Sequence, residues 1–357
     1  MRLFRRSPRR PFRIDKIIIA LGIFLFCFLP LVNSETKHAV RLSTWIVYWD
    51  LPSLARLSPQ ILSQFDSLSL FAYHFDEEGH LIPAISDLDQ IRTRLPISTE
   101  GTRPKMYLTV VNDVVGKGKP RLKDPDVVHQ IVSCPRKRQN HIKELVLLAK
   151  YYDGIEVDYE NLHAKSRDDF SIFIRELAKV LHKKKRLLSV VVEPKTRDFF
   201  SSMGKALDYK SLGESADQIK VMLYYYHYVG GTPGPLAPSD WVSKVIAYAQ
   251  ENIPPEKICA VFSLHGIDWK EKKSELISLA RVKEIQNKKN YLIKQPEKEA
   301  SPFFQFRDDD GISHELWFED DVSLTQKKEL LLKVGISEMG LWRWGSADPS
   351  VFGLFLE

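Results

Sequence analysis

Three carboxylates occupy every second position of one short stretch of the chain. Glu156, Asp158 and Glu160 lie in the segment Tyr151-Tyr-Asp-Gly-Ile-Glu-Val-Asp-Tyr-Glu160. Successive side chains of a strand point to opposite faces, so the three acids share one face, about 7 Å apart. Like charges at this spacing repel one another, and the arrangement gives the fold no stability by itself. The pattern therefore favours a strand whose polar face lines a catalytic pocket over an exposed acidic edge strand.

The same stretch resembles the D-G-x-D-x-D-x-E motif of glycoside hydrolase family 18, the chitinase-like barrels. Asp153, Asp158 and Glu160 match the motif, whereas Glu156 replaces its middle aspartate. The resemblance covers about residues 41–353 and is closest to the bacterial group with spore-cortex and peptidoglycan-acting members. It implies an α/β fold of the (β/α)8 TIM-barrel type and a glycosidase that acts on N-acetylglucosamine glycans such as peptidoglycan or chitin.

The resemblance also implies a role for each acid. Glu160 would protonate the leaving glycosidic oxygen and later activate water, and Asp158 would hold the N–H of the substrate's 2-acetamido group. Glu156 would exchange a proton with Asp158 deeper in the barrel, and Asp153 would brace the start of the strand. The implied mechanism is substrate-assisted and retaining. Because burial and like charge raise carboxyl pKa values, the row predicts a shared proton and a protonated Glu160 at neutral pH.

Two further strand ends match the same family in part. Met222-Leu-Tyr-Tyr225 resembles M-x-Y-D, in which the tyrosine hydrogen bonds the acetamido carbonyl and the last position is an aspartate. The tryptophan on which the family stacks its sugar corresponds to Trp342. Any one such ring more often packs in a core, but rings at several strand ends together favour a carbohydrate cleft. The candidates for contact with the sugar are Tyr224, Tyr225, Trp342, Tyr73 and Asn112.

Eight predicted strands alternate with helical patterns, independently of the motif. A barrel of this kind carries its active site at the C-terminal ends of its strands, so Glu160 would lie at the mouth. Predicted helices cover residues 54–65, 88–95, 124–150 with a break at Cys134-Pro135, 166–186, 239–252 and 320–334, and residues 166–169 resemble a capping box. The predicted strands cover residues 41–49, 67–73, 105–111, 151–160, 187–193, 219–225, 257–264 and 338–344.

One segment interrupts this alternation between the seventh strand and the last helix. Residues 266–316 predict a small α+β insertion, with a helix at 274–286 and a β-hairpin around the Asp-Gly turn at 308–311. Two cysteines, Cys134 and Cys259, follow the N-terminal segment. Two free thiols are the ordinary reading, and a disulfide between them stays open.

The first 34 residues predict an export signal. Residues 1–16 carry seven Arg or Lys and one Asp, which accounts for the whole net charge of +6. An apolar run over residues 17–32 follows, too short for the ~20 residues of a membrane span, with small side chains suited to cleavage after Ser34. We therefore expect a barrel over residues 35–357 that is exported to a bacterial envelope, the periplasm or the medium. An uncleaved anchor, the one expected membrane contact, is the alternative.

The expected partner is a polysaccharide that contains N-acetylglucosamine. Without the leader, the chain has no basic excess of the kind that nucleic-acid binding needs. No metalloprotease, C-x-x-C, nucleophile-elbow or P-loop motif is present, and we expect no cofactor and no metal. A non-catalytic, lectin-like barrel is the alternative function, because Glu156 and Tyr225 depart from the family pattern. An envelope scaffold that binds a protein through the insertion is a third.

Overall fold

The computed structural model describes residues 40–86, 88, 91, 95, 103–198, 204–271, 273–289, 291–296 and 301–355. The predicted leader and most of the predicted helix at 88–95 lie outside these residues. Within the described part of the chain, no helix combines the length and the apolar character that crossing a membrane requires.

The described strands form a closed parallel barrel, as predicted. The strand order is β1-β13-β8-β7-β6-β5-β4-β2, and pairing of β1 with β2 closes the ring. A short strand, β3 (Leu81–Pro83), pairs antiparallel with the C-terminal end of β2. The barrel strands are β1 (Arg41–Val47), β2 (Ser67–Phe75), β4 (Lys105–Val114), β5 (Gly154–Asp158), β6 (Leu187–Val192), β7 (Gln218–Met222), β8 (Ile258–Ser263) and β13 (Glu338–Trp342).

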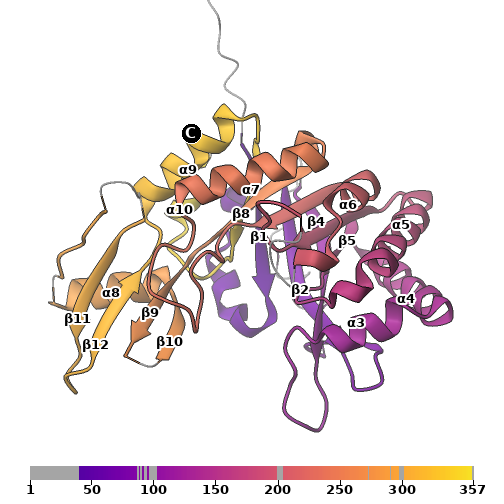
Figure 1. Cartoon of the computed structure of the whole chain (residues 1–357), viewed down its shortest axis with the longest axis horizontal. Coiled ribbons are helices and arrows are strands. Elements are labelled where there is room, and N and C mark those ends of the chain that lie inside the picture. The colour runs from indigo at the N-terminus through magenta and orange to yellow at the C-terminus, as the bar shows by residue number, and fades with distance from the viewer. Residues whose placement is uncertain are drawn as a thin grey trace, which may run out of the picture. The chain divides into compact units, whose positions relative to one another are not determined.

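Helices link the parallel strands and cover the outside of the barrel. Figure 1 shows α3 to α6 on one side, and α7 and α9 along the adjoining side. The α-helices are α1 (Pro59–Leu62), α3 (Pro125–Val132), α4 (Pro135–Leu148), α5 (Arg167–Lys183), α6 (Tyr209–Ser215), α7 (Ser239–Asn252), α9 (Asp321–Lys333) and α10 (Ser350–Gly353). Short 3-10 turns are η1 (Tyr48–Arg56), η2 (Ala149–Tyr151), η3 (Ala164–Ser166), η4 (Gly204–Ala206) and η5 (Pro255–Lys257). The predicted break at Cys134-Pro135 is confirmed between α3 and α4.

Alternation along the strands divides the buried side chains into two layers. On β5, Ile155 and Val157 join the large apolar core between the strands and the helices. Trp45, Phe71 and Met222 belong to a second, smaller cluster in the barrel interior. The acidic face of β5 shares this interior, so the predicted separation of apolar and acidic faces is confirmed.

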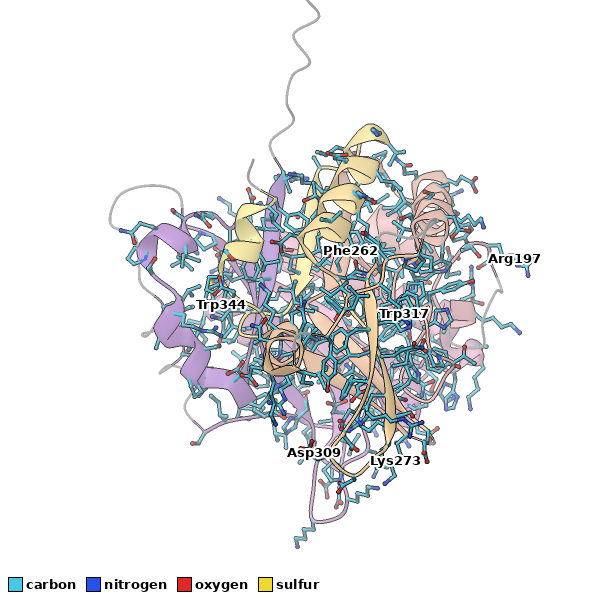
Figure 2. All side chains as sticks on the ribbon, turned by 90° about the vertical axis from the view of Figure 1, so that its left-hand side faces the viewer. Arg197, Phe262, Lys273, Asp309, Trp317 and Trp344 are labelled. Atoms are coloured by element: carbon cyan, nitrogen blue, oxygen red, sulfur yellow. The ribbon has the colours of Figure 1, made fainter. Side chains whose placement is uncertain are left out.

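The insertion forms its own antiparallel sheet, in the order β10-β9-β12-β11. Its elements are β9 (His265–Lys270), β10 (Lys273–Ser278), α8 (Leu279–Lys289), β11 (Phe303–Arg307) and β12 (Ser313–Trp317). Figure 2 is viewed from the side of the insertion, with Lys273 and Asp309 near the bottom and Trp317 above them. The predicted hairpin at 308–311 is confirmed. The helix predicted at 274–286 is wrong in its first turn, because β10 pairs with β9 over Lys273–Ser278 and α8 begins only at Leu279.

Three smaller predictions need correction. Instead of a helix over 54–65, the chain forms η1 and the single turn α1, because Pro59 lacks an N–H and can only begin a helix there. Ser166 makes no capping hydrogen bond to α5; it ends a 3-10 turn, and its hydroxyl contacts Nδ1 of His129 at 2.9 Å. Asn112 lies within β4 and not beyond its end.

Candidate active site

Glu156 lies completely buried inside the barrel, where its carboxylate has partners from five other strands. The ammonium of Lys220 on β7, which is also completely buried, lies 2.6 Å from Oε2 of Glu156. Four neutral groups also donate to this carboxylate: Trp45 Nε1 at 2.6 Å, Ser69 Oγ at 2.9 Å, Thr109 Oγ1 at 2.9 Å and Ser189 Oγ at 3.2 Å. Lys220 also lies 4.1 Å from the centre of the Trp45 ring.

This network changes the role expected for Glu156. A buried carboxylate is stable when its charge is paired and its oxygens are hydrogen bonded, and both conditions hold here. Small Ser and Thr side chains on the facing strands leave space for the extra methylene. The geometry therefore does not support the predicted proton exchange with Asp158. Glu156 and Lys220 form a structural ion pair beneath the barrel mouth.

Four charged side chains meet at the mouth itself: Lys123, Asp158, Glu160 and Glu193, which we call the mouth cluster. Glu160 follows β5, and its side chain is only 14% exposed, so it does not point into bulk solvent. The ammonium of Lys123 lies 2.6 Å from Oε1 of Glu160 and 3.6 Å from Oδ2 of Asp158. An ammonium at this distance stabilises a carboxylate. This contact with Lys123 was not part of the sequence prediction for Glu160.

Asp158 has a strongly raised pKa. Burial raises the pKa of Asp158 to about 8; Lys123 opposes this rise, while Glu160, Glu156 and Glu193 add to it. Its Oδ1 is buried and has no hydrogen-bond partner among the residues described here. At neutral pH, Asp158 therefore holds its proton beside the Glu160 carboxyl that Lys123 contacts.

The raised pKa of Asp158 predicts a particular dependence of stability on pH. Folding raises this pKa from 3.8 to about 8, so in that window the folded protein binds a proton that the unfolded chain has released. Stability therefore falls as the pH rises through the window, by at most about 1.4 kcal/mol per unit. Asp158→Asn cannot ionise, so its Tm should fall less than the wild-type Tm between about pH 6 and pH 8.5. Equal falls in thermal melts of the two proteins would contradict the assignment.

The backbone around Glu160 is fixed on both sides by β4 and β6. Asn112 accepts from the N–H of Glu160 at 3.0 Å and donates to its carbonyl at 2.8 Å, which leaves Asn112 a positioning contact and not an exposed sugar contact. The next N–H, of Asn161, donates to Oε1 of Glu193 at 2.7 Å. Lys123 is held in turn, because its N–H donates to Asp113 at 2.8 Å.

Of the aromatic candidates, the structure brings Tyr224, Tyr225 and Trp342 to this region. Tyr225 is 41% exposed, and its hydroxyl donates to Oε2 of Glu160 at 3.4 Å. Burial, followed by the charges of Glu160 and Asp158, raises the pKa of Tyr224 well above its ordinary value. Trp342 ends β13, with its ring centre 5.6 Å from that of Trp45.

Tyr73 does not join this group. It packs against the outer core, because the register of β2 against β4 shifts between Phe71 and Tyr73. Asp153 braces the start of β5 as predicted: Arg103 donates two hydrogen bonds to it, at 2.6 and 2.8 Å, and the N–H of Met106 a third at 2.8 Å.

Sequence reasoning missed Lys123, Lys220 and Glu193. Lys220 and Met222 are two residues apart on β7, so they face the same side of the strand. The inward position of Lys220 could therefore be predicted once β7 was assigned. Glu193 directly follows β6, where a barrel places its active-site residues, and this position was a usable signal. Lys123 lies in a loop with a φ of 51°, and no sequence pattern marks it.

The described residues contain no other obvious reaction centre. None of their His, Cys, Asp and Glu side chains gather in groups of three or more that could hold a metal ion. Cys134 and Cys259 are both free thiols. A cavity of about 830 Å³ lies between Gly230–Pro233 and the insertion sheet, but no residue of the mouth cluster lines it. The mouth cluster is suited to proton transfer at a bound polar substrate.

Comparisons with known proteins give the family of the chain. A profile described as glycosyl hydrolases family 18 matches residues 123–347. The cortical fragment-lytic enzyme of Bacillus anthracis is 30% identical over 346 residues, which cover 91% of this chain and 76% of that enzyme. YdhD of Bacillus subtilis, named as a sporulation-specific glycosylase, is 27% identical over 284 residues, which cover 78% of this chain and 65% of YdhD.

A solved structure shows the same fold. The crystal structure of the Bacillus cereus spore cortex-lytic enzyme SleL matches with a TM-score of 0.78 and 24% identity, over 90% of this chain and 74% of SleL. The profile match covers more than half of the chain and includes β5, Glu160 and Trp342. The chain therefore belongs to glycosyl hydrolase family 18, a family of glycosidases.

Proposed function

We propose that the protein is an exported β-N-acetylglucosaminidase that cleaves peptidoglycan or a related N-acetylated glycan by substrate-assisted, retaining catalysis. The observation that carries this proposal is the pair of adjacent, largely buried carboxyls at the barrel mouth, Asp158 and Glu160, which share contact with Lys123. General acid catalysis at a glycosidic oxygen requires a carboxyl that can hold and then release a proton.

The proposed reaction begins with one proton moving within this pair. Asp158 holds the proton in the free protein, whereas hydrolysis needs it on Glu160. A sugar that enters between Lys123 and Glu160 weakens their ion pair, and the proton then passes from Asp158 to Glu160. The ionised Asp158 accepts the acetamido N–H through its free Oδ1, and Tyr224 donates to the acetamido carbonyl.

Bond cleavage then follows without a protein nucleophile. The acetamido oxygen attacks the anomeric carbon as Glu160 gives its proton to the leaving oxygen, which forms a cyclic oxazolinium ion. The ionised Asp158 stabilises the positive charge on the acetamido nitrogen. Glu160 next takes a proton from water, which attacks the same face from which the leaving group departed. The product keeps its β configuration, and return of the proton from Glu160 to Asp158 restores both carboxyls to their starting states.

The choice of substrate and location has separate support. The relatives are named for lysis of cortical fragments and for sporulation-specific glycosylase activity, which favours a peptidoglycan-like polymer for this chain as well. The arginine-rich start followed by an apolar run favours export. Half-exposed Trp49 and Tyr225 offer flat rings to sugar faces near the acids.

The test compares N-acetylated and de-N-acetylated polymers of equal length. We expect new reducing ends from N-acetylglucosamine oligomers or purified peptidoglycan, and the first product detected by NMR to be the β anomer. The de-N-acetylated polymer should be cleaved at least about 100-fold more slowly, because it lacks the internal nucleophile. Cleavage of both polymers at equal rates would refute the substrate-assisted mechanism.

A barrel that binds glycan without cleaving it is the second candidate. The observation in its favour is the Lys123–Glu160 ion pair, which neutralises the proposed acid in the free protein. This candidate predicts that the protein is retained on insoluble peptidoglycan or chitin and that no reducing ends appear after long incubation. Release of reducing ends excludes it.

A further inference from the structure

Glu193 differs from the other buried glutamates in how few partners it has. The residue is 6% exposed and directly follows β6, next to β5. Oε1 accepts one hydrogen bond, from Asn161, while Oε2 is buried and has no partner among the residues described. A buried carboxyl with an unpaired oxygen costs stability, so the position calls for an explanation.

Buried glutamates in structural roles elsewhere in this chain are satisfied at both oxygens. Glu156 has Lys220 and four neutral donors. Glu319 has Lys327 at 2.6 Å on Oε2 and Ser301 at 3.0 Å on Oε1. The fold therefore has the means to pair a buried carboxylate, and it does not do so for Glu193. A hydrogen bond to a single backbone N–H does not require a carboxyl, because the amide oxygen of Gln would serve equally well.

Titratable side chains from several elements surround Glu193. Glu160 and Asp158 of the β5 segment repel its ionised form, whereas Lys123 from the loop before α3 attracts it. Tyr225, beyond β7, faces it as well, and Tyr209 of α6 donates its hydroxyl to the backbone carbonyl of Glu193 at 2.6 Å. Burial and then the charge of Glu160 raise the pKa of Glu193 to about 7, so this carboxyl gains and loses its charge near neutral pH.

We propose that Glu193 is a positioning residue for the acid Glu160: it fixes the backbone that follows Glu160, and its negative charge opposes Lys123 so that Glu160 can hold a proton. This inference rests on the proposed function of Glu160 as the general acid. Lys123 alone would keep Glu160 ionised and unable to protonate a leaving group. An ionised Glu193 offsets that effect, because two neighbouring carboxylates share a proton more readily than one carboxylate takes it up alone.

The decisive variant is Glu193→Gln, which keeps the size of the side chain and an oxygen for the N–H of Asn161. The alkaline limb of the kcat/KM profile reports loss of the proton that Asp158 and Glu160 share in the free enzyme. We expect this limb to move to lower pH by about one unit, which is an about tenfold loss of kcat/KM above the limb. Below about pH 6 wild-type Glu193 is itself neutral, so the two profiles should converge there.

Two further variants test the direction of the shift in the alkaline limb and provide a control. Lys123→Gln removes the opposing charge, so its alkaline limb should move to higher pH. Glu176→Gln removes one negative charge from an ion pair with Arg138 that joins the outer helices α4 and α5, outside the mouth cluster, and should leave the limb in place. A limb that stays fixed in Glu193→Gln, or that moves to higher pH, would overturn the proposal.

A second measurement does not need turnover and so separates the two proposals. Carbon-13 at the glutamate carboxyls reports each titration by NMR, with the signals assigned through Glu160→Gln and Glu193→Gln. We expect the titration midpoint of Glu160 to fall by about one pH unit in Glu193→Gln. If the wild-type protein is inactive but the Glu160 midpoint falls in Glu193→Gln, only the proposed function is refuted. If the wild-type protein is active but the Glu160 midpoint is the same in Glu193→Gln, only the role of Glu193 is refuted.

Discussion

Replacing Glu160 with Gln should reduce hydrolysis of N-acetylated glycans by about 10²–10⁴-fold, the range typical of a lost general acid. Gln has nearly the size of Glu and can still accept from Tyr225, but it cannot donate a proton to a leaving oxygen. Lys123 keeps a carboxyl neighbour in Asp158 at 3.6 Å, so we expect the variant to fold. The loss should fall on kcat, measured from new reducing ends on oligomers of N-acetylglucosamine, with a smaller change in KM.

The aglycone provides an internal control for this variant. A nitrophenolate leaves without protonation, so a nitrophenyl glycoside should lose much less of its cleavage rate in Glu160→Gln than an oligosaccharide does. Tyr225→Phe removes only the 3.4 Å contact with Glu160 and should have a small effect on both substrates. Undiminished oligosaccharide cleavage by Glu160→Gln would remove the basis of the proposed mechanism. Equal losses on both substrates would place the loss on the later activation of water by Glu160, a step that both substrates share.

The barrel and its acidic strand could be predicted from the sequence because both depend on local periodicity. Alternation along β5 sends Glu156 and Asp158 inward and Ile155 outward wherever the strand lies in the ring. Asp153 likewise had to lie at the strand start, where it meets Arg103. These features depend on neighbours along the chain, and a single sequence contains that information.

The charge balance of the site could not be predicted, because it depends on contacts between distant strands. Lys220 is 64 residues from Glu156 along the chain, and only the closed barrel brings them to 2.6 Å. Lys123 reaches Glu160 from a loop in which its φ is 51° and its N–H donates one hydrogen bond to Asp113. The sequence prediction for Glu160 considered only the acids of one strand and did not include Lys123, whose ammonium lies 2.6 Å from Glu160.

Backbone irregularities account for the other errors. The register shift within β2 turns Tyr73 towards the outer core, and a strict period of two cannot foresee such a bulge. In the insertion, residues 273–278 have a composition compatible with a helix, yet pairing with β9 makes them a strand. Tertiary pairing overrides local propensity in such short segments.

Replacing Lys220 with Met should destabilise the protein by about 3–5 kcal/mol, the typical cost of leaving one member of a buried ion pair uncompensated. Lys220 and Glu156 are both completely buried, so water cannot reach the carboxylate that remains. Met fills most of the space of the lysine stem, which keeps the loss electrostatic and not steric. Urea unfolding measures the effect as a lower midpoint with an unchanged m-value.

The double variant Lys220→Met/Glu156→Gln separates structural pairing from catalysis. It removes both charges together, and the four neutral donors can still bond the amide oxygen, so much of the lost stability should return. If Glu156 serves only this ion pair, the double variant keeps the pH profile of hydrolysis, because the protons that matter lie on Asp158 and Glu160. A strongly shifted profile in a stable double variant would restore Glu156 to the proton-transfer pathway. If Lys220→Met lowers the free energy of unfolding by less than about 1 kcal/mol, the Lys220–Glu156 ion pair does not stabilise the barrel interior as proposed.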